Sequence, residues 1–432
     1  MGWWFKLVLW QRVLGALLLG VAVGLAFRSF GGTVVVDGVT HYPGAEFVTT
    51  WIKPFGTAFV QLIKMLVVPL VFTTLVTGIT SMGHPSKLGT IGVRAFLLYV
   101  FTTLVAVSIG LIFGSIFKPG SGVDFTDVAP NVLAGNAPSM TERLINIIPA
   151  NPVHALASGD MLAIIFFALL LGVAILMVGK KAKPVEDFFK ASVEIMFKIT
   201  HWVMEVAPYG VFALITWVTA AKGVETFSSV LMLALALYLG CITHMLLMYG
   251  GLIKLVLRLP LIRFFRGILD AQVVAFSTST SAGTLPVTIA CVQDNLGIKP
   301  VVAGSVLPLG ATINMDGTSL YLGLLALFAA NAFGLDITLT DYALIAMTAT
   351  LASIGTASIP SASLFMLAIV LPVIGVSPEQ TALMVGFILP FDRPLDMMRT
   401  MTNVTGDAAV ATAVAKWEGE LDEEVYRRVA KV

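Results

Sequence analysis

Long apolar segments alternate with short polar ones along the chain. Apolar runs long enough to cross a membrane recur at about 8–29, 51–80, 91–117, 157–179, 190–220 and 226–257. Several exceed the ~20 residues that a perpendicular helix needs, which predicts tilted helices. Hydrophobic residues make up 57% of the chain and charged residues 12%, too little charge to solvate a soluble surface of this size. We therefore expect an all-α polytopic membrane protein.

Basic residues gather in every second loop between these runs, and the other loops contain fewer of them. By the positive-inside rule, this alternation predicts that both termini lie in the cytoplasm. The aromatic pair Trp3-Trp4 precedes the first run without a small-residue cleavage site, so we expect a retained helix with an interfacial belt. The basic stretches contain His84, Lys87 and Arg94; Lys180, Lys181, Lys183 and Lys190; Lys254, Arg258, Arg263 and Arg266; and, near the end, Lys416, Arg427, Arg428 and Lys431.

Net charge and the soft metal ligands exclude several functions. The formal charge is +1, which argues against nucleic-acid binding. Cys241 and Cys291 lie in apolar surroundings and indicate neither a disulfide framework nor a zinc site. The five histidines have no second ligand at metal spacing, so we expect them in ordinary packing or loop roles.

The second half of the chain contains two apolar regions that are interrupted by tips rich in serine and threonine. The first tip lies in 275–286 and the second in 352–363, and each stands between arms that are short for a span. Irregular backbone at membrane depth is tolerated only where it is buried in protein or lines an aqueous cavity. The pattern predicts two re-entrant hairpins.

Each predicted hairpin is followed by a helix with a polar motif. After the first comes Asn314-Met315-Asp316-Gly317-Thr318, where unwinding would expose carbonyl, amide and carboxylate oxygens that suit a hard cation. The alternative is a helix kink with a satisfied Asn/Asp pair. Two copies of a hairpin plus a broken helix are the internal symmetry of secondary transporters, which bind their substrate at the repeat interface.

The second polar motif occupies 392–407. On a helix, five polar residues of this segment share one ~80° stripe, with Thr400 at its edge. Buried ionisable groups are costly unless they are paired, hydrated or bound to an ion, so the stripe indicates a binding site. A soluble amphipathic helix or a membrane helix with an internal salt bridge is the alternative. The stripe consists of Asp392, Asp396, Arg399, Asn403 and Asp407.

These side chains fit an acidic α-amino acid. Hydroxyl and N–H groups at the hairpin tips favour a carboxylate, and Arg399 can clamp a second carboxylate with two hydrogen bonds. Asp396 lies within one turn of Arg399 and provides a partner for an ammonium group. Asp407 is a candidate sodium ligand.

The two tips, the Asn-Met-Asp-Gly-Thr motif and Asp396-x-x-Arg399-Thr-x-x-Asn403-Val-x-Gly-Asp407 occur in the order typical of one family. Over essentially its whole length, the chain resembles the dicarboxylate/amino acid:cation symporters, the glutamate transporter homologues. This resemblance implies eight transmembrane helices plus two re-entrant hairpins, a homotrimer, and elevator-type symport of aspartate or glutamate with Na⁺, without enzyme activity. The implied organisation is scaffold helices 1 and 2 (1–85), helix 3 of the transport domain (86–118), scaffold helices 4 and 5 for trimerisation (119–225), the remaining transport domain (226–418) and a cytoplasmic tail (419–432).

The resemblance also implies roles for individual residues, with the second hairpin as the external gate. The implied substrate contacts are Thr280, Ser281, Thr318, Ile359, Ser363, Asp396, Arg399, Thr400 and Asn403. The implied sodium ligands are the Leu309–Gly310 backbone region, Asn314, Asn403 and Asp407 at one site; Tyr99, Thr102, Thr103, Asn314 and Asp316 at a second; and oxygens near Thr312, Met315, Ser353, Ile354 and Thr356 at a third.

Two departures from the family pattern concern arginine. Archaeal members have an arginine where this chain has Ser279, and potassium-coupled animal members have one at the position of Met397. Their absence argues against potassium countertransport. Arg393 either supplies the missing charge or pairs with its neighbour Asp392, and we favour the pairing.

Other functions fit the motifs less well. Proton-coupled C4-dicarboxylate carriers of the same family lack the acid that matches Asp396, because their substrates have no ammonium group. An intramembrane aspartyl protease needs two converging acids that share a proton, which Arg, Asn and Thr partners would suppress. An anion channel has no use for Asp316 and Asp407. Aspartate and glutamate differ by one methylene, so both remain candidates.

Overall fold

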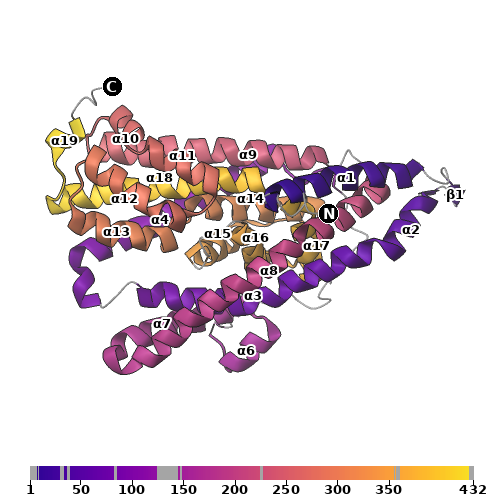
Figure 1. Cartoon of the computed structure of the whole chain (residues 1–432), viewed down its shortest axis with the longest axis horizontal. Coiled ribbons are helices and arrows are strands. Elements are labelled where there is room, and N and C mark those ends of the chain that lie inside the picture. The colour runs from indigo at the N-terminus through magenta and orange to yellow at the C-terminus, as the bar shows by residue number, and fades with distance from the viewer. Residues whose placement is uncertain are drawn as a thin grey trace.

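A computed structural model describes residues 7, 9–29, 34–36, 39–81, 85–123, 145, 148–223, 227–354, 356 and 361–427. The described part is helical apart from a small antiparallel pair, β1 (Val34–Val36) and β2 (Val39–His41), and one isolated bridge. The expected aromatic belt at Trp3-Trp4 and the expected substrate contact Ile359 lie outside the described residues. Figure 1 shows helices that run mostly along the long axis of the molecule.

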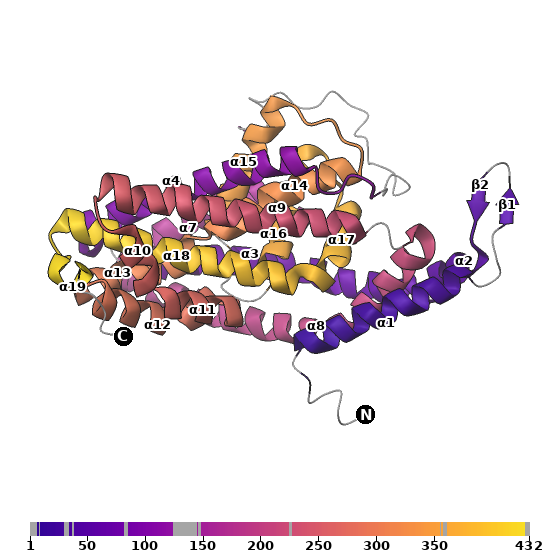
Figure 2. The same ribbon diagram turned by 90° about the horizontal axis from the view of Figure 1, so that it is seen from above.

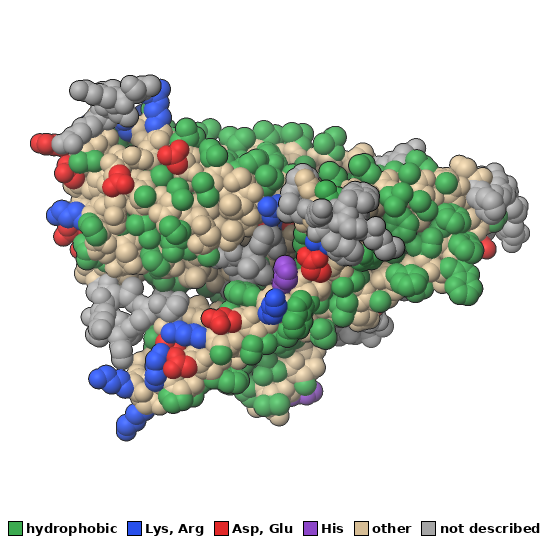
Figure 3. Space-filling view, in the orientation of Figure 1, with side chains coloured by type: hydrophobic (Ala, Val, Ile, Leu, Met, Phe, Trp, Pro, Cys, Tyr) green, Lys and Arg blue, Asp and Glu red, His purple; other side chains and the backbone are tan. Residues whose placement is uncertain are grey.

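The six predicted apolar runs all form helices. Four spans among the described residues are long and apolar enough to cross a membrane: Gln11–Ser29, Thr90–Phe117, Ser228–Val256 and Pro300–Ala332. On the face in Figure 3, charged side chains gather near the end with α10 and α19 and along α8, and hydrophobic side chains cover much of the rest. The helices of the six runs are α1 (Leu9–Ser29), α3 (Lys53–Ser81), α4 (Pro85–Phe117), α7 (Met161–Val178), α8 (Lys183–Lys222) and α9 (Ser228–His244).

The helices form two groups by their contacts, and the buried apolar residues of both groups belong to one continuous core. In the first, α8 packs along α1 and α3, and α3 also contacts α7. At one end, β1 and β2 link α1 to α2 (Pro43–Trp51), and in Figure 2 α1 and α2 both extend to the right end of the molecule, beside the strands. In the second group, α14 (Asp316–Ala332) contacts α4, α9, α15 (Leu339–Ile354) and α18 (Asp392–Glu418). Every residue of α14 except Asn331 is buried, so α14 is the centre of the second group.

A helical hairpin forms at the first predicted tip. Helices α11 (Leu269–Thr278) and α12 (Ser281–Ala290) pack against each other and follow α10 (Leu261–Gly267). Ser279 has a left-handed backbone (φ 56°) that ends α11. The hydroxyl of Thr280 then accepts a hydrogen bond from Gly283 N at 3.2 Å and caps α12.

The second hairpin is formed by α15 and α16 (Ala362–Val370), which also pack against each other. Most of the link between them lies outside the described residues. A short 3₁₀ turn and α17 (Pro378–Ile388) then lead to α18. Ser377 and Gln380 form a capping box that starts α17.

The predicted helix break is confirmed in the first copy and wrong in the second. Helix α13 (Pro300–Ile313) ends at Asn314 (φ −86°, ψ 83°), and α14 begins after Met315 (φ −113°, ψ 53°). In contrast, α18 is continuous for 27 residues through its polar stripe. Its buried polar side chains find partners on other helices and on their own helix, so its backbone has no need to unwind.

Residues after α18 contact the segments that precede α10 and α13. Helix α18 ends at Gly419 (φ 73°), and α19 (Glu423–Arg427) follows. Between them, Leu421 bridges to Ile298. Hydrogen bonds from Lys416 and Arg427 hold the pKa of Glu423 below its usual range. This part of the expected tail is therefore packed against the helices.

Candidate functional site

A cavity lies where both hairpins, the α13–α14 break and α18 meet, and its space of about 270 Å³ includes open solvent. Six of the predicted substrate residues line it, together with Met315 and Thr356 from the predicted sodium ligands. Two other predicted substrate residues do not line the cavity. Thr280 caps α12, and Arg399 lies behind the side chains that line the cavity. The complete lining is Ser279, Ser281, Met315, Thr318, Thr356, Ala362, Ser363, Asp396, Thr400 and Asn403.

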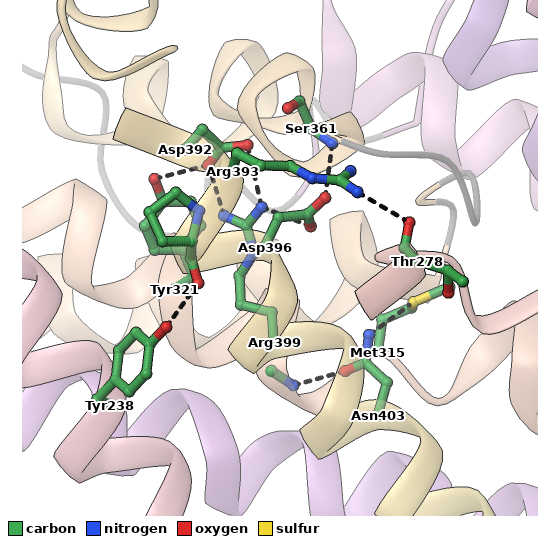
Figure 4. A network of polar contacts seen from close by, with 12 residues as sticks. Tyr238, Thr278, Met315, Tyr321, Ser361, Asp392, Arg393, Asp396, Arg399 and Asn403 are labelled. Carbon is green, nitrogen blue, oxygen red and sulfur yellow. Dashed lines mark hydrogen bonds and ion pairs between the residues drawn. The ribbon is translucent and has the colours of Figure 1, made fainter. Parts of the chain in front are cut away.

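The polar stripe of α18 is buried as its helical spacing predicted. Asp392 and Arg399 are 0% exposed, and Asp396 is 7% exposed. Arg399 donates from Nη2 to Asp396 Oδ1 at 2.7 Å and binds Asp392 with both η nitrogens. Its guanidinium also lies over the ring of Tyr321, 4.0 Å from the centroid. These contacts neutralise a charge that hydrocarbon would not tolerate (Figure 4).

Asp396 is the charged side chain of the cavity wall among the described residues. Its Oδ1 accepts from Arg399, and its Oδ2 accepts from the backbone N of Ser361 at 3.0 Å. Ser361 has a left-handed backbone (φ 62°) just before α16. Asp396 therefore connects α18 to the second hairpin and presents negative charge to the cavity.

The interpretation that Arg393 pairs with Asp392 is wrong. Asp392 faces inward to Arg399 and accepts a further hydrogen bond from Tyr321 at 3.1 Å. Arg393 points away and donates to the carbonyl oxygens of Ser277 and Thr278, at 3.3 and 3.4 Å. Neighbouring residues on a helix lie about 100° apart, so one inward side chain leaves the next facing another element. Arg393 thus contacts the end of the first hairpin arm (Figure 4).

The α13–α14 break brings the first predicted sodium set together. Asn314 Nδ2 donates to the carbonyl of Asn403 at 3.2 Å and to Asp407 Oδ1 at 2.9 Å. Gly310 lies so close to Asp407 and to the Tyr99 hydroxyl that an added Cβ would collide with both. The carboxylate, amide and backbone oxygens of this region are hard donors that suit a small cation.

The second predicted sodium set also converges. Thr103 Oγ1 donates to Asp316 Oδ1 at 2.7 Å, and Thr102 Oγ1 lies 3.4 Å from Asn314 Oδ1. Tyr99, one turn earlier on α4, donates to Val306 O at 3.1 Å. All five side chains are buried. Three helices therefore enclose this cluster of oxygens.

The third predicted set is the least assembled. The hydroxyls of Thr312, Ser353 and Thr356 donate to backbone carbonyls of their own segments, at 2.9, 2.8 and 3.0 Å. Met315 contacts Asn403 through its sulfur, which accepts from Nδ2 at 3.2 Å. Ile354 ends α15. Among the described residues no three Asp, Glu, His or Cys side chains group as a metal site, so hydroxyl, amide and backbone oxygens are the available donors.

Sequence reasoning missed three aromatic residues of this region. Tyr321 donates to Asp392, and Tyr249 donates to Asp316 Oδ2 at 2.6 Å. His244, expected to have an ordinary packing role, faces the same Oδ2 at 3.1 Å. The available signal was their hydrogen-bonding groups within apolar runs, because such groups need a partner when buried.

Comparison with known proteins identifies the family. Residues 9–417 match the sodium:dicarboxylate symporter family. This chain belongs to that family. It is therefore a multi-pass membrane protein and a transporter, not an enzyme, and the family couples the uptake of acidic amino acids or C4-dicarboxylates to cations.

Relatives within the family differ in the substrates that they are named for. The chain is 34% identical over 412 residues to the proton/sodium-glutamate symport protein of Geobacillus stearothermophilus, covering 93% of this chain and 96% of the relative. It is 33% identical to the proton/glutamate-aspartate symporter of Bacillus subtilis, with coverages of 96% and 95%. It is also 32% identical to the C4-dicarboxylate transport protein of Rhodospirillum rubrum, with coverages of 97% and 90%. Overall identity does not separate these substrate classes.

Proposed function

We propose that this chain is a sodium-coupled symporter of an acidic amino acid, L-aspartate or L-glutamate. The observation that carries the proposal is the position of Asp396 in the cavity wall. An α-amino acid has an ammonium group that a carboxylate can pair with, and a C4-dicarboxylate has none. Asp396 shares its counter-ion Arg399 with Asp392, so its buried charge is only partly compensated and favours the amino acid.

The charge balance around the cavity supports this choice. Asp392 and Asp396 face the single guanidinium of Arg399, so one negative charge remains in excess. The ammonium group of the substrate neutralises that excess. An acidic amino acid and a C4-dicarboxylate both bring two carboxylates, but the dicarboxylate brings no ammonium group, and it therefore meets Asp396 as a repulsive neighbour.

The carboxylates of the substrate have donors available on both hairpins. The hydroxyls of Ser279 and Ser363 are buried in the lining without a hydrogen-bond partner among the described residues. Arg399 Nε is likewise buried without a described partner. In this proposal one substrate carboxylate accepts hydrogen bonds from the hydroxyls of the hairpin tips, and the other accepts from Arg399.

Cation and substrate binding are coupled through the segment that they share. Asn403 lines the cavity, accepts from Gly317 N at 2.8 Å through Oδ1, and accepts from Asn314 through its carbonyl. Sodium bound at Asn314 and Asp407 therefore fixes a residue of the substrate cavity. Because both ligands stabilise the same arrangement of the break, each raises the affinity for the other.

The transport cycle that we propose moves 86–118 and 226–418 as one body against scaffold helices from 1–85 and 119–225. The second hairpin is its outer gate, the assembly is a homotrimer, and both termini are cytoplasmic. Packing of α14 against α4, α9, α15 and α18 supports a coherent moving body. Light scattering of the purified protein in detergent measures the oligomeric state.

The runner-up function is proton-coupled C4-dicarboxylate symport, which the name of the Rhodospirillum rubrum relative favours. Uptake of labelled L-aspartate into proteoliposomes separates the two, with an inward sodium gradient, a proton gradient or neither. Uptake that requires sodium and is competed by glutamate supports the proposal. Uptake driven by protons alone, or competed better by succinate than by glutamate, contradicts it. Liposomes without protein provide the background.

A further inference from the structure

Two buried aromatic residues beside the proposed cation site have no role in the function described above. His244 is the last residue of α9, and Tyr249 closes the π-helical turn Met245–Tyr249 that follows. Both are 0% exposed, and their rings pack edge to face with centroids 4.7 Å apart. A π turn brings residues five apart close to one full turn, so both side chains face the same neighbour.

That neighbour is Asp316, which is itself 0% exposed. Its Oδ2 accepts from the Tyr249 hydroxyl at 2.6 Å and from His244 Nε2 at 3.1 Å. Its Oδ1 accepts from Thr103 at 2.7 Å. The two carboxylate oxygens therefore have different surroundings. Aromatic donors bond one of them, and the other faces the Thr103 hydroxyl of α4.

The donors on the two sides also differ in what they can exchange. The hydroxyl of Thr103 can rotate and offer a lone pair to a cation, because hydroxyls both donate and accept. Nε2 of His244 must carry the proton in order to donate to a carboxylate, and it then offers no lone pair. Nδ1 of the same ring is buried without a hydrogen-bond partner among the described residues. Among the described residues, Asp316 is therefore the hydrogen-bond partner of this ring.

We infer that His244 and Tyr249 are positioning residues for Asp316. They hold Oδ2, which leaves Oδ1 aimed at Thr103 and the α13–α14 break, where the coupling cation binds. Such outer donors fix the orientation of a ligand and commonly change ion affinity by about 10–100-fold when removed. This inference rests on the proposed sodium site, although it does not depend on which substrate is carried.

Sodium binding can be measured without transport. The melting temperature of the purified protein in detergent is followed against sodium concentration, with choline replacing sodium at constant ionic strength and no amino acid present. Tyr249→Phe removes one hydroxyl and keeps the ring, and we expect it to need about 10-fold more sodium for half-maximal stabilisation. Tyr342→Phe removes a hydroxyl that bonds Ser115 at an exposed position, and it serves as the matched control.

Histidine variants test whether the donor itself matters. His244→Gln keeps an N–H donor and should stay within about 3-fold of the wild-type sodium midpoint, and His244→Leu should shift it by about 10-fold. Lower melting temperatures with an unchanged sodium midpoint in Tyr249→Phe and His244→Leu would show only a structural role and overturn the inference. A wild-type protein whose melting temperature does not rise with sodium would also overturn the inference. Succinate-specific uptake would instead overturn the substrate assignment alone.

Discussion

Asp392 and Arg399, two turns apart on α18, are joined by two parallel hydrogen bonds. Nη1 lies 2.9 Å from Oδ1 and Nη2 lies 3.2 Å from Oδ2, and both side chains are buried. Such a bidentate pair fixes the plane of the guanidinium as well as its charge. The orientation of Arg399 toward the cavity wall is therefore set by a residue that does not line the cavity.

Asp392→Asn should destabilise the protein and weaken substrate binding. The change leaves Asp396 as the single counter-ion of Arg399, so Asp396 is less available to an ammonium group. Breaking a buried pair costs about 3–5 kcal/mol, and we expect a lower melting temperature and a higher KM for aspartate. Asp187→Asn, which removes an exposed pair with Lys183, is the control and should change neither. Wild-type stability and KM in Asp392→Asn would contradict this role.

Asp396→Asn should abolish uptake of aspartate and glutamate. The variant keeps an oxygen for the backbone N of Ser361 but loses the charge that the ammonium group needs. Initial rates of uptake into proteoliposomes measure the effect, and we expect a loss of about 100-fold or more, since truncating one partner of a buried charge pair costs at least 2–5 kcal/mol. Retained wild-type aspartate uptake would remove Asp396 from the substrate site.

Arg399→Cys should lose acidic substrates, because it removes the guanidinium that bonds Asp396 in the cavity wall. The single variant leaves two buried carboxylates without their counter-ion, so we expect it to be poorly stable. The double variant Asp392→Asn, Arg399→Cys removes one charge of each sign and is the better test. The expected result is that serine or alanine competes with the residual amino acid uptake of the double variant and that aspartate does not. Competition by aspartate as strong as in the wild type would contradict it.

Arg393→Gln should release the end of the first hairpin arm. The two hydrogen bonds from Arg393 are long and partly exposed, so their loss is worth about 0.5–1 kcal/mol. We expect a rise of about 2–5-fold in the KM for substrate, because Ser279 of the cavity follows directly on Thr278. Arg393→Lys keeps the charge and should recover most of the affinity. An identical KM in Arg393→Gln and the wild type would show that this contact does not affect substrate binding.

Gly317→Ala should destabilise the site, because a Cβ at this position would overlap the carbonyl oxygen of Arg399. Overpacking of this kind costs about 1–3 kcal/mol, and here it separates α14 from α18. The matched control is Gly304→Ala in α13, where an added Cβ meets nothing within 4 Å. That change should be neutral or stabilising by up to about 1 kcal/mol. Melting temperatures in detergent report both, and equal values would contradict the close approach.

The polar residues of the site could be predicted from local patterns. Helical spacing placed Asp392, Asp396 and Arg399 on one face of α18, and the glycine beside Asn314 and Asp316 marked the helix break. Both signals lie within one segment of the chain. They indicate a site because a buried charge is costly unless it has a partner. The domain division, the trimer and the ion sites stay predictions.

Contacts between distant segments could not be predicted in the same way. Tyr249 and His244 reach Asp316 across 67 and 72 residues, and neither lies in a motif that indicates a partner. The pairing of Arg393 was wrong because adjacency in sequence is not adjacency on a helix surface. The prediction of a second helix break was wrong because the sequence pattern shows where polar residues lie. It does not show whether other side chains already form hydrogen bonds with them.

The order of synthesis makes the α13–α14 break a point of vulnerability. Asn314 bonds Asn403 and Asp407, which lie 89 and 93 residues later in the chain. A ribosome adds about 5–20 residues per second, so Asn314 waits roughly 5–20 s for the carbonyl of Asn403 and the carboxylate of Asp407. Until α18 arrives, the nascent protein holds an unwound segment in which the Asn314 amide lacks these two acceptors, and lipid cannot replace them. A chain cut short before α18 therefore presents the membrane quality-control machinery with a polar defect, whatever the state of its other helices.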